Sequence, residues 1–114
     1  FKVNARRLLP RRAFSPRGTM ARRKLLSEEE IRARLGEIPK WTRKGRAITR
    51  TWTFDGFPSA LAFINRVGAL AEEMNHHPDI ANSWATVSLS LTTHDVGGLT
   101  ERDFVLAKKI DALG

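Results

Sequence analysis

The stretch IANSWATVSLSLTTH, residues 80–94, decides the fold, because apolar and hydroxyl side chains alternate along most of it. From Ala85 to Thr92 every second residue is apolar, and the residues between are serine or threonine. A period of two places successive side chains on opposite faces of a strand. The stretch therefore predicts two strands, or one bent strand, with one face buried and the other polar.

A helix is predicted upstream of this stretch, between residues 57 and 76. Its apolar side chains recur at spacings of four, three and four, the stripe of a helix that packs on a sheet. The stripe consists of Phe63, Val67, Leu70 and Met74. Pro58 suits the first helical turn, and Pro78 disfavours helical backbone at the residue before it. We therefore expect the helix to end near His76 and His77 to be extended.

Two elements are predicted before this helix. Ser27 and Glu30 have the spacing of a capping box, which indicates a helix from there to about Glu37. The segment WTRKGRAITRTWTF, residues 41–54, alternates again between apolar side chains and threonine. It predicts a hairpin that turns near residues 44–46.

A last helix is predicted after the deciding stretch. Thr100 and Asp103 have the spacing of a second capping box, so the helix should begin there and run to the end of the chain. The order of elements is then α-β-β-α-β-β-α. It predicts an α+β fold of two layers, a four-stranded antiparallel sheet with three helices on one face.

The composition indicates one folded domain and a separate basic tail. The 114 residues are 41% hydrophobic, which is enough for a single core. The net charge of +8 is concentrated in residues 1–24, which hold nine basic side chains and no acidic one. Residues 25–114 hold eleven basic and twelve acidic side chains. We therefore expect residues 1–24 to be a disordered tail and residues 25–114 to form the domain.

Three interpretations of the basic tail stay open. It is upstream sequence before a start at Met20 or a plain solvated segment, an organelle transit peptide within residues 1–19, or a nonspecific phosphate-binding arm. Nucleic acid is expected as a partner only through such nonspecific contacts. The chain has no cysteine and no apolar run near the roughly 20 residues that cross a bilayer. We expect a cytoplasmic protein that binds no membrane, or an organellar one if the tail is a transit peptide.

Three histidines are candidates for a site. His76 lies at a helix end, His77 at the extended position before a proline, and His94 at the polar end of a strand. These places allow one cleft, and a group of imidazoles suits proton donation and proton removal near neutral pH. Surface histidines and a metal site stay open as alternatives. Adjacent histidines lack the i, i+4 spacing with which two imidazoles share a zinc ion, and no cysteine supports them.

Three further residues are candidates for supporting roles. Glu72, one turn before His76, is placed to orient that ring, or else is an ordinary solvated helix residue. Asp103 is most simply a helix cap. Trp84 is interpreted as core or interface packing in preference to direct ligand contact.

The spacing of these residues resembles the signature of the pterin-4a-carbinolamine dehydratases. That signature runs as an acidic or related residue, three spacers, His-His-Pro, five or six spacers, an aromatic residue, nine spacers, a histidine and a later aspartate. The matching residues are Glu72, His76, His77, Pro78, Trp84, His94 and Asp103. The similarity covers roughly residues 25–113 and leaves the tail outside.

The resemblance implies the same two-layer fold and a specific reaction. That reaction is the dehydration of 4a-hydroxytetrahydropterin to quinonoid dihydropterin, which recycles the pterin cofactor of aromatic amino-acid hydroxylases. A general acid protonates the departing 4a-hydroxyl while a base takes the N5 proton. No cofactor and no metal is implied for the dehydratase itself.

The resemblance also assigns residues to this reaction. It gives the catalytic work to His76, His77 and His94. The implied substrate-binding residues are Asn75, His76, His77, Pro78, Thr92, Thr93, His94 and Asp95. Some family members carry aspartate where this chain has Asn75, so a carboxylate contact is not implied at that position.

The resemblance implies self-association and leaves a second function open. Family members are dimers and tetramers, so we expect a homotetramer or at least a homodimer. Small residues on the second helix would allow close helix approach; they are Ala60, Gly68 and Ala71. Animal members also act as dimerisation cofactors of a homeodomain transcription factor, so a noncatalytic binding module of the same fold is the alternative.

Overall fold

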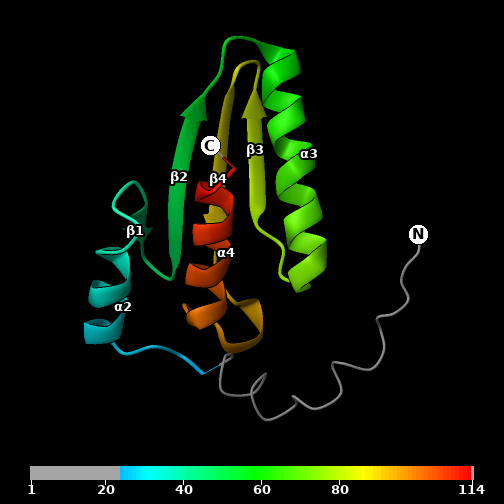
Figure 1. Ribbon diagram of the computed structural model, residues 1–114. Coiled ribbons are helices and arrows are strands. Elements are labelled where there is room, and N and C mark those ends of the chain that lie inside the picture. Colours follow the sequence, from blue (N-terminus) through cyan, green and yellow to red (C-terminus); the bar gives the residue numbers. More distant parts are fainter. Residues whose placement is uncertain (1–23, 114) are drawn as a thin grey trace.

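The computed structural model describes residues 24–113 (Figure 1), and the predictions made for residues 1–23 lie outside the described part of the chain. The elements are α2 (Glu28–Leu35), β1 (Thr42–Lys44), β2 (Ala47–Thr53), α3 (Phe57–Met74), β3 (Asp79–Ser83), β4 (Thr86–Leu91), the short 3₁₀ helix η2 (His94–Val96) and α4 (Glu101–Asp111). This order confirms the predicted α-β-β-α-β-β-α pattern, to which η2 is an addition.

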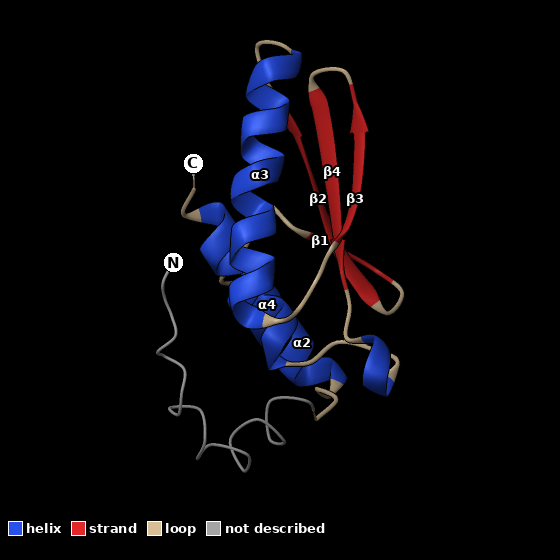
Figure 2. Ribbon diagram, turned by 90° about the vertical axis from the view of Figure 1, so that its right-hand side faces the viewer, coloured by secondary structure: helices blue, strands red, loops and turns tan. Residues whose placement is uncertain are grey.

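The four strands form one antiparallel sheet in the order β1-β2-β4-β3. Helices α3 and α4 lie against one face of this sheet (Figure 2). Helix α2 is tied to β1 by an ion pair between Glu28 and Arg43, and it contributes Ile31 to the same core. The predicted α+β class with two layers is therefore confirmed.

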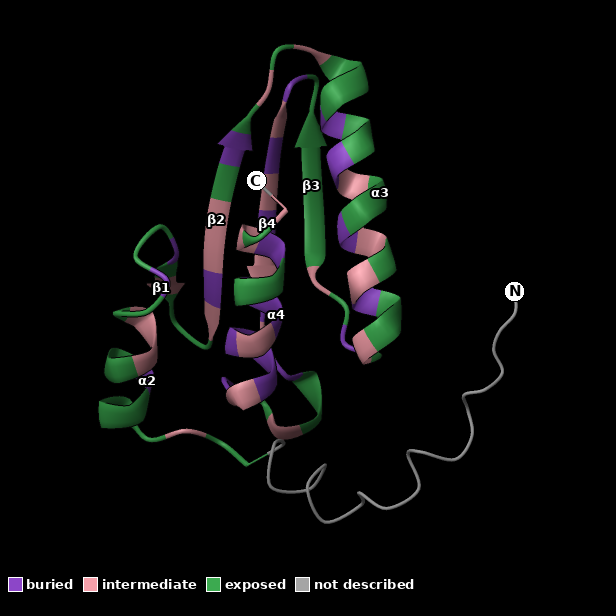
Figure 3. Cartoon of the chain, viewed as in Figure 1, coloured by how far each residue is buried: buried purple, intermediate pink, exposed green. Residues whose placement is uncertain are grey.

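The deciding stretch forms the two strands β3 and β4, which a tight turn joins. Buried and half-buried residues alternate along β4, and its buried residues Val87, Leu89 and Leu91 belong to the core (Figure 3). In the register with β2, Val87 lies opposite Trp52 and Leu91 opposite Ile48. The alternation thus marks the face that packs on the helices, while the serines and threonines between face away.

Helix α3 ends at Met74, slightly before the predicted end near His76. Asn75 adopts the left-handed conformation (φ 52°, ψ 44°), which stops the helix. Its N–H donates to the carbonyl of Glu72 (3.2 Å), and the next N–H, of His76, donates to the carbonyl of Ala71 (3.0 Å). No helix within residues 24–113, α3 included, is both long enough and apolar enough to cross a bilayer.

Both predicted capping boxes are present. Ser27 Oγ accepts from the N–H of Glu30 (3.1 Å), while Glu30 Oε1 accepts from the N–H of Ser27 (2.8 Å). Thr100 and Asp103 cap α4 in the same reciprocal way. Helix α2 ends at Leu35 rather than near Glu37, because the N–H of Glu37 bonds three residues back and tightens the last turn.

Acid should weaken the start of α2. The hydrogen bond from the Ser27 N–H holds the pKa of Glu30 below its ordinary value of 4.5. The Glu30 carboxylate therefore stabilises the folded chain fully at pH values above 4.5. This stabilisation is lost as the pH falls through the lowered pKa of the folded state. We expect a lower melting temperature at pH 3 than at pH 5. Glu30→Gln, which keeps an acceptor but does not titrate, should reduce that difference; an equal difference in both proteins would contradict the assignment.

Candidate active site

A polar cavity of about 240 Å³ opens where the end of α3, the end of β4 and the first turn of α4 meet. The end of β4 and the start of α4 are close in sequence, and the fold brings the end of α3 to the same end of the molecule (Figure 1). The residues that line the cavity are Asn75, His76, His77, Thr92, Thr93, His94, Asp95 and Arg102. The structure thus brings together all three candidate histidines.

His76 points inward because of the left-handed turn at Asn75. Its side chain is only 8% exposed, and its Nε2 lies 2.7 Å from Oδ1 of the fully buried Asp103. Of the two alternatives for Glu72, the one in which it orients this ring is therefore wrong. The turn rotates His76 away from the outer face of α3, where Glu72 lies, and toward α4.

Asp103 lies at the centre of a buried hydrogen-bond network. Its Oδ2 accepts from the hydroxyl of Thr93 (2.9 Å) and from the N–H of Thr100 (2.9 Å), while Oδ1 faces His76. The hydroxyls of Thr93 and Thr100 lie 2.8 Å apart. The predicted helix cap is confirmed, and the same carboxylate also orients a histidine of the cavity.

His77 lies on the outside and has the partner that was expected for His76. Its Nε2 lies 2.6 Å from Oε2 of Glu72, and the two side chains are 54% and 79% exposed. The contact with Glu72, an exposed residue of α3, places the His77 ring on the outer face of that helix. Glu72 thus orients a histidine, but the exposed one.

His94 begins η2 instead of ending a strand, because β4 stops at Leu91. A β-bridge from Thr93 to Gly98 closes the loop that contains η2, and Gly97 ends η2 with a φ of 71°, which favours glycine. The His94 side chain is exposed at the cavity. The hydroxyl of Thr92 donates to the backbone carbonyl of Arg46 and so fixes this segment against the β1–β2 turn.

Four predicted site residues lie outside the cavity lining: Glu72 and Asp103, described above, and Pro78 and Trp84. Pro78 is half-buried beside the cavity, after His77. Trp84 lies in the two-residue turn between β3 and β4, at the far end of these strands from the histidines (Figure 1). It is 71% exposed with a φ of 52°, so packing in the core is wrong, and packing at an interface stays a prediction. The turn places its side chain beyond the last strand pair, where the core does not reach.

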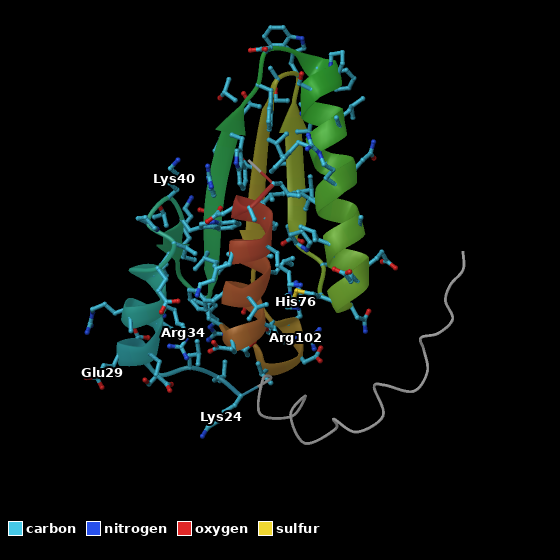
Figure 4. The ribbon with its side chains drawn as sticks, viewed as in Figure 1. Lys24, Glu29, Arg34, Lys40, His76 and Arg102 are labelled. Carbon is cyan, nitrogen blue, oxygen red and sulfur yellow. The ribbon has the colours of Figure 1, made fainter. Side chains whose placement is uncertain are left out.

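Arg102 is a cavity residue that the sequence analysis missed. It lies in the first turn of α4, is 9% exposed, and donates from Nη2 to the carbonyls of Met74 (2.8 Å) and Asn75 (2.9 Å). Figure 4 shows its side chain and that of His76 at the same end of the molecule. The only signal in the sequence was a basic side chain in the first turn of a helix, where the helix dipole favours acidic ones.

The arrangement can carry out proton transfer on a small polar ligand. One imidazole is buried and oriented by a carboxylate, and two others, His77 and His94, are accessible at the cavity. Among residues 24–113 there is no group of three or more histidine, aspartate or glutamate side chains placed to hold a metal ion.

Comparison with known proteins assigns the family. The family model described as pterin 4 alpha carbinolamine dehydratase matches residues 24–113. The chain belongs to this family. The matched residues include every residue that lines the cavity.

Curated relatives from several bacteria carry the same family name on a provisional basis. A pterin-4-alpha-carbinolamine dehydratase named in this way from Roseiflexus sp. (strain RS-1) is 53% identical over 88 residues, 77% of this chain and 95% of that protein. One from Nocardia farcinica is 49% identical over 89 residues, 78% of this chain and 94% of that protein. The domain thus spans nearly the full length of these dehydratase relatives.

Two solved structures share the pterin dehydratase fold. A transcriptional coactivator/pterin dehydratase from Brucella melitensis is 33% identical, with a TM-score of 0.76, and covers 79% of this chain and 98% of its own. A pterin dehydratase-like protein, identified as a RuBisCO assembly factor in the alpha-carboxysome, is 26% identical with a TM-score of 0.53. It covers 64% of this chain and 84% of its own.

Proposed function

We propose that this protein dehydrates 4a-hydroxytetrahydropterin to quinonoid dihydropterin by histidine acid/base catalysis and so recycles the cofactor of aromatic amino-acid hydroxylases. The observation that carries the proposal is the convergence of His76, His77 and His94 on one polar cavity in a chain of the pterin dehydratase family. A small hydrogen-bonding heterocycle suits such a cavity, because its polar lining offers donors and acceptors at close range.

The Asp103 carboxylate supports a basic role for His76. A carboxylate only accepts hydrogen bonds, so the 2.7 Å contact places the proton of the neutral ring on Nε2. Nδ1 then carries the lone pair that can take the N5 proton of the substrate. The carboxylate also stabilises the imidazolium that results.

The accessible histidines supply the other half of the reaction. When His94 is protonated it can donate to the departing 4a-hydroxyl, which leaves as water, while the N5 lone pair forms the new double bond. We assign to His77, whose Nε2 lies 2.6 Å from Oε2 of Glu72, the positioning of the ligand. The substrate contacts we propose are Asn75, His76, His77, Pro78, Thr92, Thr93, His94 and Asp95.

An assay with enzymatically generated carbinolamine tests the proposal directly. An aromatic amino-acid hydroxylase supplies the substrate, and the decay of its absorbance is followed with and without this protein. We expect dehydration well above the uncatalysed rate, with saturation as substrate rises. Dehydration at the uncatalysed rate, with protein whose folding is verified by circular dichroism, would overturn the proposal.

A noncatalytic binding module is the second candidate function. It is favoured by the two solved structures, one described as a transcriptional coactivator as well as a dehydratase and the other as an assembly factor. The alternative we propose is a dimerisation cofactor of a transcription factor. Variants of the cavity histidines distinguish the two functions, because they should abolish dehydration and leave binding through an outer surface intact.

We predict a homotetramer, or at least a homodimer, although the reason differs from the one expected. Ala60 and Ala71 are buried within this chain, so of the three small residues only the half-buried Gly68 remains for close helix approach. Exposed apolar side chains remain on α3, at Phe57 and Leu61, and every residue of the edge strand β3 is exposed. Light scattering should give two or four times the chain mass of 12.9 kDa. A monomer at micromolar concentration would contradict this.

A further inference from the structure

The backbone at the end of α3 is held by α4. Arg102 Nη2 lies 2.8 Å from the carbonyl oxygen of Met74 and 2.9 Å from that of Asn75. Carbonyls at the end of a helix have no partner within the helix, and a cation there also interacts favourably with the helix dipole. The guanidinium therefore caps the C-terminus of α3 from a neighbouring element.

Arg102 is poorly placed for the stability of its own helix. It lies in the first turn of α4, where the partial positive charge of the helix terminus disfavours a cation. It is also 9% exposed, and burial of a charge costs free energy unless the charge is well paired. The contacts that offset these costs include the two carbonyls of the α3 terminus, so the residue joins α4 to that terminus.

We infer that Arg102 is a positioning residue for the dehydration proposed above, and the inference rests on that function. Asn75 has the left-handed conformation that turns His76 inward. Arg102 donates to the carbonyl that precedes Asn75 and to the carbonyl of Asn75 itself. The adjacent residue of α4, Asp103, binds the ring of His76 at 2.7 Å. Neighbouring residues of one helical turn thus hold the backbone and the side chain of the same segment.

The consequence is a coupling between Arg102 and His76 without direct contact. If the turn relaxes, the His76 ring loses its alignment with both Asp103 and the cavity. Displacement of a reacting group by about 1 Å costs up to roughly 10²-fold in rate. The substrate still contacts the accessible residues His77 and His94, so KM should change less than kcat does.

The test uses Arg102→Met, which keeps an apolar stem without the cation, and Arg102→Lys, which restores a cationic donor. Arg32→Ala, in α2 and exposed, is the matched control for the loss of an arginine. We expect Arg102→Met to lower kcat at least tenfold with a smaller change in KM, Arg102→Lys to recover part of the loss, and Arg32→Ala to match the unaltered protein.

A second readout does not depend on activity. Nitrogen NMR of the imidazoles reports the protonation of each ring nitrogen, and we expect Arg102→Met to change the Nε2 and Nδ1 signals of His76 while those of His94 stay in place. If Arg102→Met fails to fold, Arg102→Gln, which also removes the cation, is read in its place. Folded variants with unchanged kcat and an unchanged His76 spectrum would overturn the inference. An altered spectrum in a protein without dehydratase activity would support the coupling and refute only the proposed reaction.

Discussion

Replacing His94 with alanine should lower the rate of carbinolamine dehydration by roughly 10²-fold or more, the loss expected when a general acid or base is removed. The side chain is exposed at the cavity and belongs to the short η2 helix, so few packing contacts are lost. We therefore expect the melting temperature to stay within about 2 °C of the unaltered protein, since exposed substitutions change stability little. Steady-state kinetics and a thermal melt on one preparation measure both.

His76→Ala should cause a similar loss of activity for a different structural reason, and it should also lower stability. From the sequence alone, both histidines would be expected to tolerate replacement without a change in stability. The structure corrects that for His76, because its removal leaves the buried Asp103 without one of its partners.

His77→Ala should raise KM at least as much as it lowers kcat. An unchanged rate in both His76→Ala and His94→Ala would contradict the acid/base proposal.

The same kinetics separate proton transfer from a metal site. If the histidines move protons, activity should survive exhaustive treatment with a chelator, because no step of the proposed reaction needs a Lewis acid. Loss of activity on chelation and recovery with zinc would make the paired histidines metal ligands instead.

Replacing Asp103 with alanine should have the largest effect on stability. The side chain is fully buried, and its loss leaves the His76 ring, the Thr93 hydroxyl and the Thr100 N–H without their acceptor. Removing one partner from a buried charged network costs roughly 3 kcal/mol or more. For a domain of this size that lowers the melting temperature by more than about 10 °C. Thermal unfolding followed by circular dichroism measures the shift.

Asp103→Asn and Asp55→Ala complete this test. Asparagine keeps the shape, but its amide group donates toward His76 and favours the wrong ring tautomer, so activity should fall about 10²-fold even in folded protein. Asp55 is an exposed loop residue, and its replacement by alanine should leave the melting temperature unchanged. Equal melting temperatures for Asp103→Ala and Asp55→Ala would show that the buried network contributes little.

Periodic and local signals in the sequence predicted the fold well. The alternation in β4 identified the buried face through Val87 and Leu89, and the spacing of Thr100 and Asp103 identified the start of α4. Both are short-range properties of the chain, set by the geometry of a strand and of a helix terminus. Predictions from these properties therefore do not depend on how the rest of the chain packs.

The partners inside the site could not be predicted in the same way. Glu72 and His76 are close in sequence, yet a single left-handed residue, Asn75, turns the ring toward a carboxylate 27 positions away. The role of Arg102 likewise depends on where α4 crosses the end of α3. Such contacts are set by tertiary packing, which spacing along the chain does not encode.

Because the β3–β4 turn exposes Trp84, the three tryptophans differ in how far a quencher in solution can reach them. Trp41 and Trp52 are 4% and 7% exposed, with their rings in edge-to-face contact, whereas Trp84 is 71% exposed. Acrylamide should therefore quench one fluorophore in the native state and reach the other two only after unfolding. If acrylamide quenches less of the emission while the protein stays folded, then another molecule covers Trp84 in the β3–β4 turn. That molecule is either a second subunit or a different protein.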